Sequence, residues 1–291
     1  MLSSPETIDH VRALLSHPAG RAHMAGICGV GMAGLAVLLA RRGLRVSGCD
    51  QGADSPMAAW LMERGIAVVA GHDPAHLDPA PELVIYSPAL PGDHPELAAA
   101  RRRGIPLVRR GEVLPLLLEG RRSIAVAGTH GKTTTSTFIA QILRGAGQAT
   151  GFCIGGESAP LGGVADAGDG TGLVVEADES DGTLAGYSPE IAVITNIDRD
   201  HLEHFSDEAE LGACFRTFAR RAGTVVYCAD DEPARRWVGD GAGAVAYGCS
   251  ARAEVRAESV REEAWSVRYD LWVRGQAAGP VVVPVPGRHN V

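Results

Sequence analysis

The spacing of hydrophobic and polar positions differs between most of the chain, where strands and helices are predicted to alternate, and its last part, where every second residue is apolar. In the first 120 residues, short apolar runs are separated by longer stretches in which apolar residues recur at helical spacing. The segments "MAGLAVLLARRG" and "PMAAWLMERG" predict helices that end at glycine. The apolar runs predict strands at residues 23–27, 45–49, 66–70, 82–86 and 106–109. Strands that alternate with helices predict a parallel sheet and therefore an α/β fold.

A second α/β region starts near residue 120, where the polar segment "EGRR" is followed by a new apolar strand from Ser123. We therefore predict one domain over residues 1–119 and another over residues 120–291. In the second domain the strand "SIAVAG" leads into a glycine loop and a helix that runs to about Gly145. Further buried strands are predicted at residues 172–177, 190–197 and 224–229.

The spacing of the hydrophobic residues changes near the end of the chain. Val267, Tyr269, Leu271 and Val273 stand at every second position. This period of two is typical of antiparallel strands. The second domain is therefore predicted to combine parallel strands with some antiparallel ones.

Composition narrows the class of protein. The 291 residues are 45% hydrophobic and 21% charged, as is usual for a globular protein. The net charge of −8 argues against a nucleic-acid binder. No apolar run reaches the length of a membrane span, and the N-terminus lacks an apolar signal core. Six cysteines without a C-x-x-C pair are typical of reduced thiols in a cytoplasmic protein. The pattern carries no signal for an oligomeric state.

The first candidate site is the segment "GICGVGMAG". Gly29, Gly31 and Gly34 match G-x-G-x-x-G between a predicted strand and a predicted helix, and Asp50 ends the next strand. Such a turn brings backbone N–H groups to a diphosphate at a helix N-terminus, and the acid can accept a ribose hydroxyl. The pattern leaves open a purely structural turn, NAD, another dinucleotide or a nucleotide sugar.

The second candidate site is the loop in "VAGTHGKTTTSTF". The common phosphate loop reads G-x-x-x-x-G-K-[ST], but Val126 stands at its first glycine position. The backbone N–H groups of residues 128–133 can still surround phosphate oxygens. Lys132 adds a positive charge, and the hydroxyl of Thr133 or Thr134 can face magnesium. The alternative is a glycine turn with a solvent-exposed lysine.

Two acidic clusters follow predicted strands of the second domain. In "VVEADESD", Glu176 interrupts an apolar run, which is costly unless the carboxylate meets a cation, so we predict a magnesium ligand. The acids that follow it, Asp178, Glu179 and Asp181, allow the alternative of a solvated loop.

The second cluster lies in "TNIDRDHLEHF", where a strand ends in Asn196, Asp198, Asp200 and His201. His201 is a candidate metal ligand, and the alternative is a structural histidine.

Four weaker signals remain elsewhere in the chain. Ser87 in "YSPALPGDHPE" and Arg109 in "RRGEVL" can contact an anionic substrate. Asn290 in "GRHN" can contact a base or belong to a simple turn. The segment "ADDEP" can start a helix, with its acids at the positive end of the helix dipole.

Taken together and in order, "GICGVGMAGLA", "SGCD", "GTHGKTTT", "EADESD", "TNIDRDHL" and "PGRHN" resemble the Mur ligases of peptidoglycan synthesis. The resemblance covers nearly the whole chain. It implies a Rossmann-like N-terminal domain for a UDP-sugar, a central domain for ATP, and a C-terminal Rossmann-like domain that helps to bind the amino acid.

The resemblance also assigns roles to residues. The ATP site would consist of Gly128, Thr129, His130, Gly131, Lys132, Thr133 and Thr134, with Asn290 near the adenine. Mg²⁺ would be held by Thr133, Glu176 and His201. The UDP-sugar would be held by Gly29, Val30, Gly31, Met32, Gly34, Asp50, Ser87 and Arg109.

The implied reaction is an ATP-dependent ligation. The closest match is to members that join L-alanine to UDP-N-acetylmuramate in the cytoplasm. The sugar's carboxylate attacks the γ-phosphate of ATP, and the amine of L-alanine then displaces phosphate from the acyl phosphate. Lys132, Glu176 and His201 would be the catalytic residues.

The end of the chain at Val291 predicts that the C-terminal domain is missing. We therefore expect this chain to bind the UDP-sugar, to bind ATP weakly and not to complete the ligation.

Three alternatives stay open from the sequence. One is another ligase of the superfamily, such as the ligase that recycles a tripeptide onto the muramate. The second is an NAD-dependent oxidoreductase that uses the N-terminal glycine loop. The third is a nucleotide-binding regulator without catalysis.

Overall fold

The computed structural model describes residues 3–17, 19–179, 182–198, 205–239, 241 and 243–291. The chain forms two compact units. The first unit contains Met1–Ser123 and Thr137–Glu176, and the second contains Ile124–Ser136 and Ala177–Val291. Each unit is thus assembled from two separate stretches of the chain. A single domain boundary near residue 120 stays a prediction.

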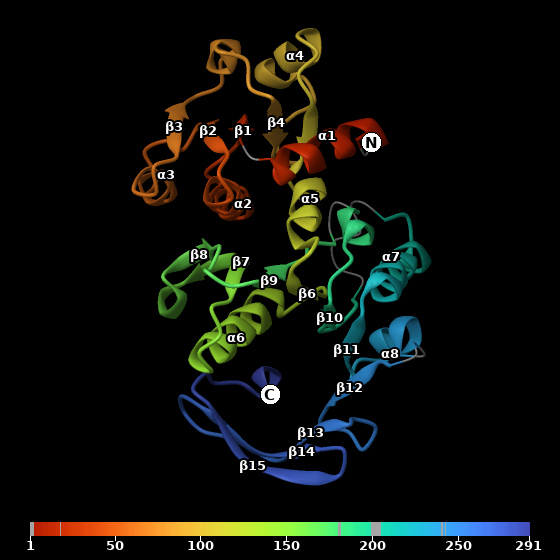
Figure 1. The fold of residues 1–291 in the computed structure, drawn as a ribbon. Helices are drawn as coiled ribbons and strands as arrows, with labels where there is room; N and C mark the ends of the chain where they lie inside the picture. The colour runs from red at the N-terminus through yellow and green to blue at the C-terminus, as the bar shows by residue number, and fades with distance from the viewer. Residues whose placement is uncertain (1–2, 18, 180–181, 199–204, 240, 242) are drawn as a thin grey trace. The chain divides into compact units, whose positions relative to one another are not determined.

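The first unit contains a five-stranded sheet in the order β3-β2-β1-β4-β5 (Figure 1). Each neighbouring pair is parallel. The strands are β1 (Arg21–Ala25), β2 (Arg45–Asp50), β3 (Ala67–Ala70), β4 (Leu83–Tyr86) and β5 (Leu107–Arg109). All five predicted strands are therefore confirmed, with ends shifted by no more than two residues.

In this part of the first unit one helix precedes β1 and the others come after strands. They are α1 (Pro5–Ser16), α2 (Val30–Arg41), α3 (Pro56–Met62), α4 (Pro95–Arg102) and α5 (Arg110–Val113). Ser4 and Ser55 cap α1 and α3, and each accepts a hydrogen bond from the third residue beyond it. Helix α2 is buried at every residue from 32 to 39, as expected for a helix that is apolar on all sides.

The first unit contains three more strands. They are β7 (Gly151–Ser158), β8 (Gly163–Asp166) and β9 (Gly172–Glu176), with β7 antiparallel to β8 and parallel to β9. Of these, β7 and β8 contact α2. A Cβ placed on Gly34 in α2 would lie 2.8 Å from Cys153 Sγ in β7. The third glycine of the N-terminal loop is therefore needed for close packing of helix and sheet.

Helix α6 (Lys132–Gly145) confirms the helix predicted after the second glycine loop. The second unit contains strands in the order β15-β14-β13-β12-β11-β10-β6. The pairs from β6 to β13 are parallel, and β13, β14 and β15 pair antiparallel. This arrangement confirms the predicted mixture of parallel and antiparallel strands.

The strands of the second unit are β6 (Arg122–Ala127), β10 (Ile191–Ile194), β11 (Thr224–Cys228), β12 (Val245–Gly248), β13 (Val255–Glu262), β14 (Val267–Val273) and β15 (Gln276–Val283). Its helices are α7 (Glu208–Arg221) and α8 (Glu232–Val238). Asp231 caps α8 by accepting from Ala234 N, which confirms that "ADDEP" starts a helix. Short 3-10 turns lie at Pro74–Leu77, Leu114–Leu118, Ala159–Leu161, Thr183–Gly186 and Arg288–Asn290.

All six cysteines are thiols outside disulfide bonds, and Cys49, Cys153 and Cys214 are buried. Among the helices that the structure describes, none combines the length and the apolar character that crossing a bilayer requires.

Candidate functional site

The glycine loop of the second unit joins the end of β6 to the start of α6. Gly128 has a φ of +141° and Gly131 a φ of +78°, a region that favours glycine. A Cβ on Gly128 would overlap Thr195 Oγ1. Among the described residues, no heavy atom lies within 4 Å of the Cβ position of Gly131. The loop is thus closed on the side of β10, while among the described residues only its own chain neighbours crowd Gly131.

The residues after β10 hold this loop in place. Asn196 Oδ1 accepts from His130 N (2.8 Å), and Asn196 Nδ2 donates to His130 O (2.9 Å). Thr195 Oγ1 donates to the same carbonyl at 2.6 Å. Thr129 Oγ1 accepts from Asp198 N at 2.8 Å. The side chains of Thr129 and Asn196 therefore fix the loop's shape. The N-terminus of α6 begins directly at this loop, and the N–H groups of a first helical turn have no acceptor within the helix itself.

Lys132 is folded back onto its own loop. Its Nζ donates to Gly128 O (2.6 Å), Thr129 O (3.2 Å) and Glu179 Oε1 (3.0 Å), and lies 2.9 Å from Glu179 Oε2. The side chains of Lys132 and Glu179 are 14% and 3% exposed, so this is a largely buried ion pair. Lys132 is therefore not the solvent-exposed lysine of the simple-turn alternative.

Glu179 is the partner that the sequence left undecided. Its side chain is buried, so the alternative of a solvated loop is wrong for this residue. Burial raises the pKa of Glu179, and the positive charge of Lys132 offsets only part of that rise. An arriving phosphate would compete with Glu179 and the loop carbonyls for Nζ.

The acids beyond β10 also influence one another. Asp231 Oδ1 accepts from Ile197 N (3.2 Å) and Ala234 N (2.7 Å), which joins α8 to the segment after β10. Burial raises the pKa of Asp231 despite these bonds, and the charge of Asp198 adds to the rise. This end of the second unit therefore concentrates negative charge beside the loop, where a divalent cation would be favoured.

Glu176 ends β9 in the first unit. Its Oε2 accepts from Gly155 N at 2.7 Å, and a Cβ on Gly155 would overlap the carboxylate. Burial raises the pKa of the nearby Cys153 thiol to about 11, and the charges of Arg110 and Glu176 act on it in opposite directions. A carboxylate held in position by a backbone amide is a hard oxygen ligand of the kind that Mg²⁺ prefers.

The N-terminal glycine loop of the first unit is braced by Asp50. Its Oδ2 accepts from Cys28 N, and its Oδ1 accepts from Gly52 N, both at 2.9 Å. Gly29 caps α2, and Val30 is the first residue of that helix. The side chain of Met32 is buried, so only its backbone can meet a ligand at the helix start. Contact between Asp50 and a ribose stays a prediction.

Arg110 supplies a cation at this loop. A Cβ on Gly31 would overlap the Arg110 guanidinium, so the arginine lies directly over the second loop glycine. The sequence pointed to the neighbouring Arg109, whose backbone N donates to Glu112 Oε2 at 2.9 Å as α5 begins. Arg109 is the last residue of β5 and Arg110 is the first residue of α5, so the sequence alone does not show which of the two reaches the loop.

The other predicted site residues lie as follows. Ser87 N donates to Ala25 O at 3.2 Å, which places Ser87 beside the start of the N-terminal loop. Thr133 and Thr134 lie in the first turn of α6. Asn290 Nδ2 donates to Pro286 O at 2.7 Å within its own turn. His201, with Asp181 and Asp200, lies outside the described residues. The ligand contacts of all these residues stay predictions.

Comparison with known proteins agrees with this arrangement. A model of the Mur ligase family catalytic domain matches residues 21–122, and a model of the Mur ligase middle domain matches residues 126–291. Similar curated proteins include UDP-N-acetylmuramate–L-alanine ligases. That of Salinispora arenicola is 42% identical over 283 residues, which are 95% of this chain and 55% of the relative. That of Kineococcus radiotolerans is 43% identical over 284 residues, 94% of this chain and 59% of the relative.

Two solved structures share the fold. The UDP-N-acetylmuramate-alanine ligase of Thermotoga maritima superposes with a TM-score of 0.83 at 28% identity, over 93% of this chain and 62% of that one. A UDP-N-acetylmuramate:L-alanyl-gamma-D-glutamyl-meso-diaminopimelate ligase from Neisseria meningitides gives 0.82 at 28% identity, over 93% and 89%. The chain spans little more than half the length of the two curated relatives named above. Because the middle-domain model alone matches more than half of it, the chain belongs to the Mur ligase family.

Proposed function

We propose that this chain carries the nucleotide-sugar and ATP sites of a cytoplasmic ligase that joins L-alanine to UDP-N-acetylmuramate. One observation carries the proposal. The chain has two separate glycine loops, each at the N-terminus of a helix and each with its own cation, Arg110 at α2 and Lys132 at α6. An NAD-dependent oxidoreductase would use only the first loop and leaves the second unexplained.

The second loop would bind the phosphates of ATP. Its glycines and the first N–H groups of α6 would surround the oxygens, and Lys132 would leave Glu179 to neutralise the γ-phosphate. The muramate carboxylate attacks that phosphorus, ADP leaves, and an acyl phosphate forms. The amine of L-alanine then attacks the carbonyl carbon, and inorganic phosphate leaves as the amide bond forms.

Mg²⁺ would be held by Thr133, Glu176 and His201. Of these, Glu176 supports the assignment best, because the Gly155 amide holds its carboxylate in one position. When bound, the ion would supply positive charge to the phosphate oxygens.

The first loop would bind the diphosphate of the UDP-sugar. Gly29, Val30 and Gly31 would offer backbone N–H groups, Arg110 would add a charged hydrogen bond, and Ser87 lies at the same edge.

Binding measurements test the proposal on this chain's own residues. Calorimetric titration of the 291-residue chain should show binding of UDP-N-acetylmuramate and, more weakly, of ATP with Mg²⁺. NADH should not compete for the first loop. Tight NADH binding together with no binding of the UDP-sugar would overturn the proposal.

A second candidate is a ligase that attaches a tripeptide to the same sugar, as the name of the Neisseria relative states. Both candidates predict the same sugar binding. Curated relatives at about 40% identity that are named as L-alanine ligases favour L-alanine.

Arg110→Met is expected to weaken binding of UDP-N-acetylmuramate roughly 10- to 100-fold, the loss that follows from removing one hydrogen bond to a charged group. The dissociation constant from calorimetry measures it. Arg102→Met, an exposed arginine at the end of α4, is the charge-matched control and should bind normally. Arg109→Met in the same assay shows how much the arginine predicted from the sequence contributes to binding, for comparison with Arg110 over Gly31. Unchanged binding by Arg110→Met would exclude its role.

A further inference from the structure

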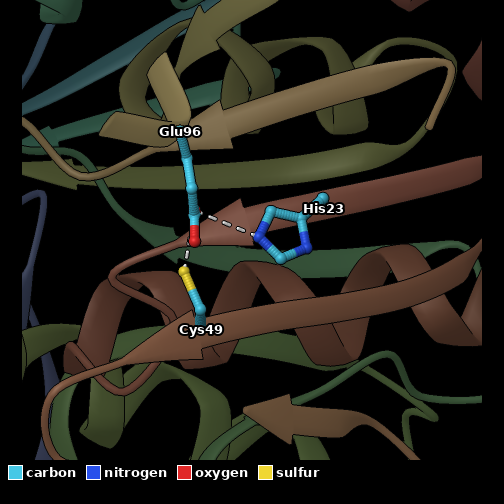
Figure 2. A group of neighbouring side chains, drawn as sticks. All are labelled: His23, Cys49 and Glu96. Carbon is cyan, nitrogen blue, oxygen red and sulfur yellow. Dashed lines mark hydrogen bonds and ion pairs between the residues drawn. The ribbon is translucent and has the colours of Figure 1, made fainter. Parts of the chain in front are cut away.

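Six side chains of types that can ligate a metal ion or titrate lie close together inside the first unit. Neither the proposed UDP-sugar site nor the proposed ATP site includes them. They are His23 in β1, Cys49 in β2, His72 after β3, His76 in the following turn, His94 before α4 and Glu96 in α4. Figure 2 shows the carboxylate of Glu96 directed between His23 and Cys49. His23, Cys49, His94 and Glu96 are at most 3% exposed.

The distances between the possible ligand atoms are close to those between neighbouring ligands of a bound metal ion. Glu96 Oε2 is 2.9 Å from Cys49 Sγ and 3.3 Å from His23 Nε2, and Cys49 Sγ is 3.1 Å from His72 Nδ1. Bonds of 2.0 to 2.3 Å in a tetrahedral zinc site put neighbouring ligand atoms roughly 3.4 Å apart. For these atom pairs an ion would need shifts of only a few tenths of an ångström. His72 and His94 form a second group with Glu96, so the nitrogen that supplies the fourth ligand would have to move closer to His23 and Cys49.

Outer contacts would orient two of these ligands toward the same point. His23 Nδ1 lies 3.3 Å from Ser47 Oγ, and in the metal-bound state a hydrogen bond from Nδ1–H to this oxygen would leave the Nε2 lone pair for the ion. Glu96 Oε1 accepts from Asp73 N (3.0 Å) and lies 2.8 Å from His76 Nδ1. These contacts occupy Oε1 and leave Oε2 to face Cys49 and His23. Metal-binding imidazoles and carboxylates commonly have such outer partners.

His94 provides a second, independent observation at this cluster. Its side chain is buried, yet neither ring nitrogen has a hydrogen-bond partner among the described residues. Its ring meets the His72 ring edge-on, with centroids 4.3 Å apart. His72, His94 and Glu96 have ligand atoms within 4.8 Å of one another, as do His23, Cys49 and Glu96. A buried polar group without a partner is costly, and a bound ion would remove that cost.

We propose that this cluster binds one zinc-class divalent ion, through Cys49 Sγ, Glu96 Oε2, His23 Nε2 and one nitrogen of the His72–His94 pair. The thiolate and imidazole donors favour Zn²⁺ or Co²⁺ over Mg²⁺, which prefers oxygen ligands. The site is separate from the magnesium site proposed for the ligase reaction. It would tie β1, β2 and α4 together beside Asp50, which braces the N-terminal loop.

The charges of the four ligands and of a divalent ion add up to zero, and one proton is released when the ion binds. Cys49 gives up its thiol proton to solvent and binds as a thiolate, while Glu96 binds as a carboxylate. Two negative ligands and two neutral imidazoles cancel the charge of the ion, so the buried site is neutral overall. Binding therefore releases one proton per ion, and affinity should rise with pH.

Cobalt spectroscopy of the whole chain tests the proposal. After removal of metals with EDTA, Co²⁺ should give a thiolate charge-transfer band and the visible bands of a tetrahedral site, at one ion per chain. Zn²⁺ should abolish these bands by competition, whereas excess Mg²⁺ should not. At a hundredfold excess over its dissociation constant, Zn²⁺ should raise the unfolding temperature by about 5 °C.

Three variants test where the ion binds. Cys49→Ser keeps a hydroxyl that can donate to Glu96, so it should fold and lose the charge-transfer band, the proton release and the thermal shift. Cys214→Ser replaces a buried thiol of α7 and should keep all three. His94→Asn tests the fourth ligand and should weaken binding at least tenfold if His94 supplies it. Absence of the bands from the wild type, or bands of equal strength in Cys49→Ser, would overturn the proposal.

Discussion

Lys132→Met is expected to abolish measurable ATP binding and to lower the free energy of unfolding by about 2 kcal/mol at neutral pH, because it leaves a buried carboxylate without its cation. Glu179 is 3% exposed and lies 2.9 Å from Nζ. Chemical denaturation gives the stability change, and calorimetry gives the loss of ATP binding.

The pH dependence has a definite sign. The pKa of Glu179 is already raised in the folded state by burial, and loss of Lys132 should raise it further. A raised carboxyl pKa costs stability at pH values above it and costs nothing where Glu179 is protonated in both states. The deficit of Lys132→Met should therefore be largest at neutral pH, shrink as the pH falls through the raised folded-state pKa of Glu179, and be gone near the ordinary value of 4.5.

A double variant separates the two effects of this substitution. Lys132→Met with Glu179→Gln should recover most of the lost stability but no ATP binding, because the buried charge is gone while the cation is still missing. Recovery of neither property would show that the ion pair is not what Lys132 stabilises. Lys132 is the only lysine of the 291 residues, so amine-directed labelling reports on it with the N-terminal amine as the internal reference. ATP with Mg²⁺ should slow the labelling of Lys132.

Glu96→Gln is expected to lower the free energy of unfolding of the metal-free chain by about 3 kcal/mol. Glu96 is fully buried and accepts from Asp73 N and Cys49 Sγ, with two imidazoles alongside. The side-chain NH2 of glutamine is a hydrogen-bond donor and would face groups that themselves donate to Glu96. Urea denaturation after EDTA treatment measures the change. Glu63→Gln, at an exposed residue after α3, should stay within about 0.5 kcal/mol of the wild type.

Acid titration gives this second prediction a separate signature. Burial acts to raise the pKa of Glu96, but hydrogen bonds from His23, Cys49 and His76 outweigh it and lower the pKa to about 2. A carboxyl pKa that is lower in the folded state stabilises the fold at pH values above 4.5, the ordinary pKa of the group. This stabilisation is lost as the pH falls from 4.5 toward 2. The wild type should lose about 3 kcal/mol over this interval, and Glu96→Gln should not. Parallel pH curves for the two proteins would contradict the assignment.

The elements of the fold could be predicted because their signals are local. Apolar runs marked β1 to β5 to within two residues, and the period of two marked β14. Glycines marked both loops, since a turn into a helix with positive φ leaves few other choices, as at Gly128 and Gly131.

The partners of the site residues could not be predicted in the same way. Lys132 meets Glu179 across 47 positions of sequence, and Glu96 meets His23 across 73. Such distances carry no periodic signal, because strand order and helix approach decide which segments meet. For this reason the sequence pointed to Arg109, and the structure places Arg110 over Gly31.

The sequence by itself determined the α/β class, the two phosphate-type loops and the acids at strand ends, because spacing and residue type suffice for these. Only the tertiary structure decided that Lys132 is held by Glu179, that Asn196 shapes the loop, and that His23, Cys49 and Glu96 share one buried point. These are properties of side chains brought together from distant segments, and burial then sets their charge states.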